Sequence, residues 1–194
     1  AEGAETQRQG GLREAELEGG RWQEPVHHQF LARNRWLTGE WDDALTEEEA
    51  AVGAAEEVVR GSARLMAGPA HGLSIRLHRG RLSEARKLLA ESEGGSLGEW
   101  QTALLLEAEG QTGKALQVLS AFWERTVAAG VLVELRQSGP DLVRIALGAG
   151  HPEVAERVVP VLETIRQRAR HPLAESAWLH ARGLIEQSVE LCSE

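Results

Sequence analysis

Apolar residues recur every three or four positions along most of the chain, which is the spacing of helices that bury one face. The run Leu73, Leu77, Leu82, Ala85 and Leu88 is a clear example. Almost no stretch alternates apolar and polar residues with the period of two that a half-buried strand requires. The pattern therefore predicts an all-α chain.

The predicted helices fall into four pairs. In the first pair, one helix runs from Pro25 to Gly39 and the other covers 41–59. The other three pairs are 62–79 with 82–93, 97–109 with 112–126, and 140–149 with 152–169. Pro140 and Pro152 suit the first positions of the helices in the fourth pair, because proline needs no N–H there. Pro160 should kink the second of these helices.

The remaining segments are predicted from glycine, proline and charge. Residues 1–24 are glycine-interrupted and charged, so we expect them to be poorly ordered or to hold part of a helix. We expect the repeat domain to occupy 25–194, with an insertion at 127–139 and a last helix from Pro172 to the end. Gly183 and Ser188 suggest a degenerate fifth joint in that last helix.

The two helices of each pair meet at a repeated motif, a glycine followed five positions later by alanine. The four copies are Gly39 with Ala44, Gly80 with Ala85, Gly110 with Ala115, and Gly150 with Ala155. Glycine fits a left-handed cap that ends the first helix tightly, and alanine lets the second helix pack close to it. The motif predicts a right-handed solenoid of about four helix pairs.

This arrangement resembles a tetratricopeptide repeat array, whose period is roughly 34 residues. The joint glycines here are 41, 30 and 40 residues apart. The family has a small residue seven positions before the glycine, as at Ala32 and Ala103, and a bulky one two positions after it, as at Trp41 and Leu82. Leu73 and Val143 depart from the small position, and Thr112 and Pro152 depart from the bulky one.

Longer runs at 35–52, 77–93, 139–163 and 177–186 resemble the helical sensor segment of large ATP-binding LuxR-type transcription regulators of actinobacteria. The resemblance covers most of 25–186. In that family a nucleotide-switching module precedes the helical array and a DNA-binding helix-turn-helix follows it. The resemblance implies a sensing platform that ends before any DNA-binding domain.

Charge and cysteine content restrict the partners. The chain has 194 residues and a formal net charge of −9, so its field disfavours direct nucleic-acid binding by this segment. Cys192 is the only cysteine, which excludes an intrachain disulfide or a multi-cysteine zinc site and fits a reducing, cytoplasmic location. No window approaches ~18 consecutive apolar residues, so we expect no membrane partner.

Motifs for catalysis, cofactors or metals are not evident. The run from Gly110 to Ala115 resembles a P-loop only superficially, because it follows a helix and has alanine where the magnesium-binding hydroxyl belongs. No two histidines are four positions apart and no H-E-x-x-H is present. Glu47, Glu48 and Glu49 are expected to lie on a solvated face. We therefore expect a non-enzyme with no cofactor and no metal.

One stripe of the first helices is a candidate binding groove, because equivalent positions of stacked repeats share a face. Tryptophan there could stack on a ligand, and arginine could bind its anionic groups, although core packing of the rings and ordinary solvation of the polar residues are alternatives. The groove residues are Arg33, Trp36, Ser74, His78, Trp100, Glu107 and Arg144.

Two functions follow from these features. The first is a regulatory module that binds a small-molecule effector or a protein partner in the groove and so biases a transcription regulator. The second is a scaffold between ATPase and DNA-binding domains that self-associates as a homo-oligomer. A concave pocket with desolvated polar groups would favour the sensor, and a flat apolar patch would favour the scaffold.

Overall fold

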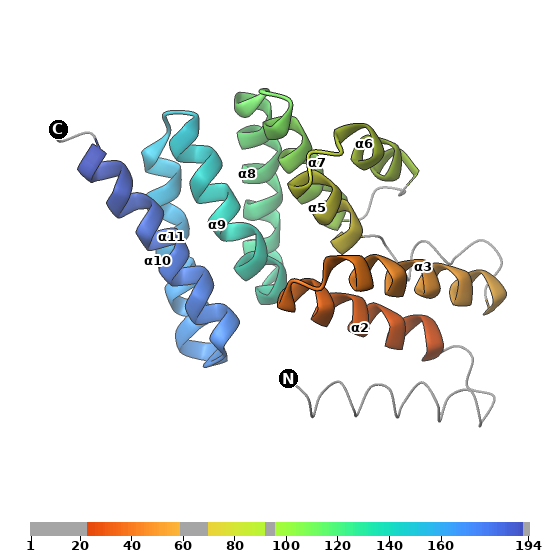
Figure 1. Ribbon diagram of the computed structural model, residues 1–194. Helices are drawn as coiled ribbons and strands as arrows, with labels where there is room; N and C mark the ends of the chain where they lie inside the picture. Colours follow the sequence, from red (N-terminus) through yellow and green to blue (C-terminus); the bar gives the residue numbers. More distant parts are fainter. Residues whose placement is uncertain (1–22, 59–69, 92–95, 192–194) are drawn as a thin grey trace. The chain divides into compact units, whose positions relative to one another are not determined.

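The computed structural model describes residues 23–58, 70–91 and 96–191. These residues form nine α-helices and no strand (Figure 1), which confirms the all-α prediction. Expectations for 1–22, 62–69 and 92–95 lie outside the described residues. The chain divides into two compact units, Ala1–Gly98 and Glu99–Glu194.

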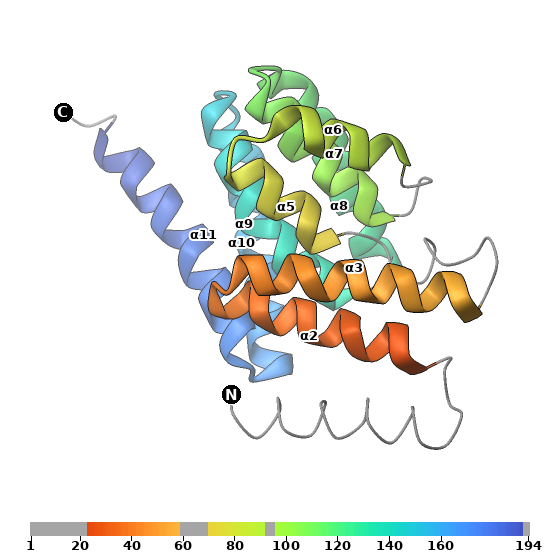
Figure 2. The same cartoon turned by 45° about the vertical axis from the view of Figure 1, so that its right-hand side comes forward.

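The first unit contains two helical hairpins. Helices α2 (Glu24–Thr38) and α3 (Trp41–Val58) form one, and α5 (Ala70–His78) and α6 (Leu82–Glu91) form the other. Helix α5 packs against both α2 and α3, and Figure 2 shows it beside α3. A first helix thus rests on both helices of the preceding pair, as in stacked repeats.

The second unit begins inside α7 (Ser96–Ala108). It continues with α8 (Thr112–Ala129), α9 (Leu132–Gly148), α10 (Pro152–Ala169) and α11 (Pro172–Leu191). Helix α9 packs against α8 and α10, and α11 packs against α9 and α10. A stripe of small residues on α11 makes this close packing possible; it consists of Ala174, Ala177 and Ala181, all buried.

The four predicted joints have the predicted geometry. Gly39, Gly80, Gly110 and Gly150 have φ values of 85°, 70°, 77° and 78°. At each joint the glycine N–H donates to the carbonyl three residues back, and the next N–H donates to the carbonyl five residues back. This pair of hydrogen bonds is the Schellman motif, in which a left-handed residue closes a helix.

Replacing a joint glycine tests this requirement. Gly80 is exposed and a Cβ there would meet nothing within 4 Å, so only its positive φ opposes a side chain. We expect Gly80→Val to lower the free energy of unfolding by about 1–2 kcal/mol in urea denaturation. Gly113→Val, at an exposed helical glycine without positive φ, should change it by less than about 0.5 kcal/mol. Equal losses in the two variants would contradict the conformational explanation.

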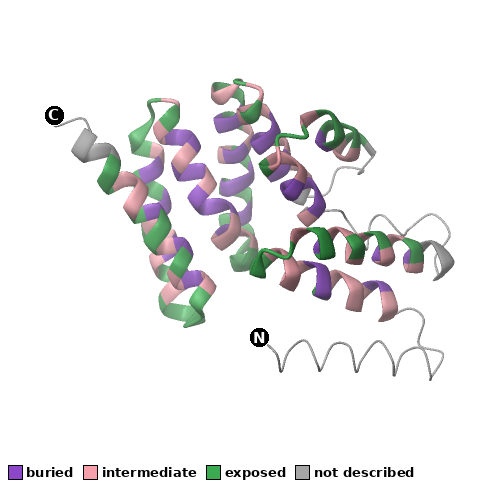
Figure 3. Ribbon diagram, viewed as in Figure 1, coloured by how far each residue is buried: buried purple, intermediate pink, exposed green. Residues whose placement is uncertain are grey.

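The alanines of the motif are in the core, as predicted. Ala44, Ala85, Ala115 and Ala155 are all 0% exposed. In Figure 3 buried residues are most frequent on α8 and α9. The second unit has the larger aromatic and aliphatic core residues, among them Leu119, Phe122, Leu142 and Leu162. Alanine is therefore used where two helices approach just after a joint, and bulky residues fill the space farther along.

Two parts of the helix prediction are wrong. Residues 127–139 are not an insertion, because α8 continues to Ala129, Gly130 makes a further left-handed turn at φ 71°, and α9 begins at Leu132. Pro140 accordingly lies inside α9 and does not open a helix. Gly183 lies inside α11 without positive φ, so there is no fifth joint. By contrast, Pro152 does occupy the start of α10.

Candidate functional site

The seven predicted groove residues are divided between the two units. Arg33, Trp36, Ser74 and His78 belong to the first unit, and Trp100, Glu107 and Arg144 belong to the second. Within each unit the structure brings some of them together, in both cases around a residue that the sequence analysis did not select.

In the second unit the three predicted residues meet around Asp141. The Trp100 indole N–H donates to Asp141 Oδ2 at 3.0 Å. Arg144 Nη2 donates to Asp141 Oδ1 at 2.9 Å, and Arg144 Nη1 donates to Glu107. These four residues, from α7 and α9, are called the α7–α9 network. Its contacts show that the predicted stripes of two successive first helices lie side by side.

The charge of the α7–α9 network is negative overall, because two carboxylates face one guanidinium. Burial opposes the charge on Arg144, but hydrogen bonds and charge from Asp141 and Glu107 outweigh it and raise the arginine pKa. The Arg144 side chain is 41% exposed, whereas Glu107 and Asp141 are 23% and 25% exposed. An anionic ligand of Arg144 would have to displace two carboxylates, so the network suits a cationic or hydrogen-bond-donating group better.

Two of the predicted groove residues are buried and do not line an exposed surface. Trp100 is 7% exposed, and its ring belongs to the core with only its N–H directed at Asp141. Ser74 is 3% exposed on α5. Helix α5 packs against α2 and α3, so a residue in this stripe can face a neighbouring helix and not solvent. Core packing, the alternative considered for the tryptophan, is what the structure shows.

Gln101, next to Trp100, is the least satisfied polar side chain described in the second unit. It is 1% exposed, and neither its Oε1 nor its Nε2 finds a hydrogen-bond partner among the described residues. A buried amide without partners lowers stability by about 1–3 kcal/mol.

Removing this amide should stabilise the chain. We expect Gln101→Met, which keeps the side-chain length, to raise the free energy of unfolding by about 1–2 kcal/mol in urea denaturation. Gln117→Met, at an exposed position of α8, is the matched control and should have little effect. A loss of stability in Gln101→Met would show that the amide does bind a partner group.

In the first unit the predicted residue Trp36 contacts His71, and the charge of the predicted residue Arg33 acts on the same ring. The rings of Trp36 and His71 are stacked, with centroids 5.0 Å apart and an interplanar angle of 16°. Burial and the nearby charge of Arg33 lower the His71 pKa to about 4, so the ring is neutral at physiological pH. His78 stacks on Trp41 at 5.9 Å, which joins the start of α3 to the end of α5.

Glu48 was expected to be solvated, but it is partly buried and caps the first turn of α5. Its Oε1 accepts hydrogen bonds from the N–H groups of His71 and Gly72 at 2.9 and 2.8 Å, and its Oε2 accepts from Gly72 at 2.8 Å. A Cβ on Gly72 would lie 2.1 Å from Glu48 Oε2, so glycine leaves the space that the carboxylate occupies. Burial raises the Glu48 pKa to about 7, against those hydrogen bonds and the charge of Arg76.

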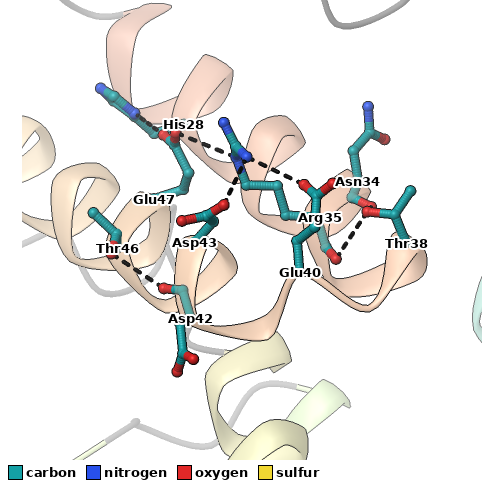
Figure 4. A network of polar contacts seen from close by, with 9 residues as sticks. All are labelled: His28, Asn34, Arg35, Thr38, Glu40, Asp42, Asp43, Thr46 and Glu47. Atoms are coloured by element: carbon teal, nitrogen blue, oxygen red, sulfur yellow. Dashed lines mark hydrogen bonds and ion pairs between the residues drawn. The ribbon is translucent and has the colours of Figure 1, made fainter. Parts of the chain in front are cut away.

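Glu47 also differs from the expectation, because it belongs to a network between α2 and α3 (Figure 4). His28 Nδ1 lies 2.7 Å from Glu47 Oε2, and Arg35 Nε lies 3.6 Å from Glu47 Oε1. Arg35 Nη1 also lies 3.2 Å from carboxylate oxygens of both Glu40 and Asp43. One arginine therefore compensates part of the acidic charge of α3. Of the three adjacent glutamates, Glu49 is the exposed one.

Further observations concern metals, membranes and known proteins. Within the described ranges, no group of three histidine, cysteine or acidic side chains is placed to hold a metal ion. None of the helices in this part of the chain is both long and apolar enough to cross a bilayer. Comparison with protein-family models, curated proteins and solved structures finds no match to this chain.

Proposed function

We propose that this chain is a non-catalytic interaction module built as a tetratricopeptide-like right-handed superhelix. Four Schellman joints, each followed by a fully buried alanine, support this architecture. So does the packing of α5 on both helices of the pair before it, and of α11 on both α9 and α10. Helix-pair arrays of this kind present the first helices of successive pairs as one binding face.

The α7–α9 network is the observation that carries the function. It places Asp141, Glu107 and Arg144 on adjacent first helices, partly exposed and held by hydrogen bonds. Fixed, partly desolvated carboxylates favour specific recognition of a cationic group. The proposed ligand is therefore a protein partner that presents lysine or arginine to this face.

The regulatory setting rests on the sequence resemblance to LuxR-type regulators. In that setting the module belongs to a larger cytoplasmic transcription regulator, and its partner or effector acts by binding one conformational state of the regulator more tightly. Direct binding of this segment to nucleic acid is disfavoured by its net charge of −9.

A scaffold is the second candidate, and an exposed apolar turn favours it. Four large hydrophobic residues at the α8–α9 turn are 37–49% exposed; they are Val127, Val131, Leu132 and Val133. Apolar residues clustered on a surface commonly mark a protein contact. In this alternative the turn holds a neighbouring domain or another copy, and the α7–α9 network only stabilises the fold.

Photo-cross-linking in cells that produce the protein separates the two candidates. A cross-linking residue at Leu147, three positions beyond Arg144 on α9, reports on the proposed face. Positions 157 on α10 and 131 at the apolar turn serve as control and as reporter of the scaffold. We expect a discrete adduct from position 147, which disappears when Glu107→Gln and Asp141→Asn remove both negative charges.

An adduct from position 131 alone, unaffected by the Glu107→Gln and Asp141→Asn changes, would support the scaffold and refute the proposed face. Asp141→Asn keeps an oxygen that can accept the Trp100 N–H, so the fold should tolerate it. Unchanged urea denaturation of the double variant would confirm that the lost adduct reflects lost recognition.

A further inference from the structure

One arginine of the second unit, Arg136 on α9, has no acidic partner. It is half-buried, and its Nε is buried without a hydrogen-bond partner. Among the residues that the structure describes, it takes part in no ion pair, whereas Arg144 and Arg166 of the same unit each contact two carboxylates. Burying a charged group without an acceptor costs free energy. A partner that brings a carboxylate to Arg136 would remove this cost.

Arg136 lies next to the exposed apolar turn between α8 and α9, which consists of Val127, Val131, Leu132 and Val133. Leu132 is four positions and Val133 three positions before Arg136, so the three residues share one face of α9. Side chains of a helix lean toward its N-terminus, and this direction takes the Arg136 side chain toward Leu132 and Val133. The unpaired positive charge and the exposed apolar surface are therefore adjacent.

The backbone of the apolar turn is held by hydrogen bonds. The Gly130 N–H donates to the Val127 carbonyl at 3.1 Å, and the Val131 N–H donates to the Thr126 carbonyl at 3.2 Å. Val131 is also the N-cap of α9, where its side chain makes no capping hydrogen bond. Serine or aspartate would stabilise the helix at this position, so helix stability does not explain the exposed valine. A turn that is already ordered loses little conformational entropy when a partner binds.

We propose that the apolar turn and Arg136 together bind a protein segment in which apolar side chains lie beside an aspartate or glutamate. The apolar side chains cover the turn, and the carboxylate accepts charge-assisted hydrogen bonds from the Arg136 guanidinium. The exposed residues come from two helix ends and the turn between them. Such an open surface suits a protein segment better than a small molecule, which needs an enclosed pocket. The inference rests on the scaffold candidate, whose partner chemistry it specifies, and does not depend on the α7–α9 network.

Titration of the full chain into labelled peptides, followed by fluorescence anisotropy, is the test. The peptides carry the same leucines on one helical face and differ only in the residue beside those leucines, which is glutamate in one peptide and glutamine in the other. We expect the glutamate peptide to bind about ten-fold more tightly, because a hydrogen bond between two charged groups is stronger than one to a neutral amide.

Two variants separate the charge from the apolar surface. Arg136→Gln should reduce the affinity for the glutamate peptide to that for the glutamine peptide. Val131→Ser with Val133→Ser should weaken both peptides alike. The matched control is Arg168→Gln, which removes the same charge at an exposed position of α10 and should leave the preference for glutamate intact. Urea denaturation of Arg136→Gln should show no loss of stability, because the buried Nε has no hydrogen bond to lose.

The results also distinguish this inference from the scaffold candidate. Peptide binding that requires Val131 and Val133 but shows no preference for glutamate would overturn the role of Arg136 and leave the scaffold surface standing. A preference for glutamate that survives Arg136→Gln would do the same. Absence of peptide binding, or binding that the changes at the turn do not affect, would overturn both. Binding of decanoate in place of the peptides, lost in Arg136→Gln, would overturn the protein partner in favour of a small acidic amphiphile.

Discussion

Variants of Glu48 and His71 should give pH dependences of stability with opposite signs. The Glu48 pKa is about 7 in the fold, above its ordinary value of 4.5. The fold therefore binds the proton more tightly, and the stabilisation is complete below pH 4.5 and lost as pH rises through 7. The His71 pKa is about 4 in the fold, below its ordinary value of 6.5. Its contribution is present above pH 6.5 and is lost as pH falls through 4.

In the wild-type chain the contributions of Glu48 and His71 to the free energy of unfolding nearly cancel between pH 4.5 and 6.5. In this range folding favours protonation of Glu48 and opposes protonation of His71. Glu48→Gln removes the glutamate contribution, so its stability relative to wild type should fall as pH decreases from 7 to 4.5. His71→Phe keeps a ring to stack on Trp36 and removes the histidine contribution, so its stability relative to wild type should fall as pH rises from 4 to 6.5. Each change should amount to about 3 kcal/mol.

Urea denaturation of each variant at pH steps across this range measures the effect. Glu49→Gln, one position along on the exposed face of α3, is the matched control and should show no added slope. The double variant of Glu48 and His71 should also follow the wild-type curve. Parallel curves for the two single variants would mean that Glu48 and His71 do not have the opposite pKa shifts described above. Titration of the His71 ring by NMR gives its pKa directly.

The sequence could predict the joints because their cause is local. A glycine that closes a helix with positive φ and an alanine five positions later both act within a few residues, so Gly39, Gly80, Gly110 and Gly150 were identified from spacing alone. The start of α10 at Pro152 was predictable for the same reason. Glycine and proline indicate a particular backbone conformation, and alanine indicates a close approach of two helices, so each feature can be predicted from one residue type.

The candidate sites were less predictable because their partners are distant in sequence. Glu48 and Gly72 are 24 residues apart, and nothing in the run Glu47 to Glu49 distinguishes the capping carboxylate from its neighbours. Asp141 was missed although it lies nine positions before Gly150, almost the same offset as Trp100 before Gly110. Comparing offsets between repeats would have found it. Trp100 and Ser74 are buried because neighbouring helices pack against them. Hydrophobic periodicity shows which residues share a face of a helix, but it does not show which of those residues a neighbouring helix covers.

The course of α9 was mispredicted because a local signal was outweighed by packing. Gly139 followed by Pro140 is a common turn signal, and it placed a helix start at 140. The structure instead continues α9 through both residues. Leu135, Ser138, Gly139 and Leu142 are all buried on this helix, and their combined packing outweighs the hydrogen bond that Pro140 cannot make. Local propensity is a weak guide where a helix is buried on this scale.

Gly139→Val should therefore be among the most destabilising single changes in the second unit. A Cβ at this position would lie 2.9 Å from Leu162 Cδ2 and 3.2 Å from Trp123 Cη2, and both neighbours are themselves buried. The leucine can yield to one methyl group only by a small rotation, and the branched valine adds two more carbons against the tryptophan ring. We expect a loss of about 3 kcal/mol in the free energy of unfolding, measured by urea denaturation.

Gly53→Val makes the same change in α3, where a Cβ meets nothing within 4 Å, and should be neutral or slightly stabilising because glycine is a poor helix former. If residues 127–139 formed a loop, as the Gly-Pro signal suggested, Gly139→Val would also be nearly neutral, so the difference between the two variants tests whether α9 passes through Gly139.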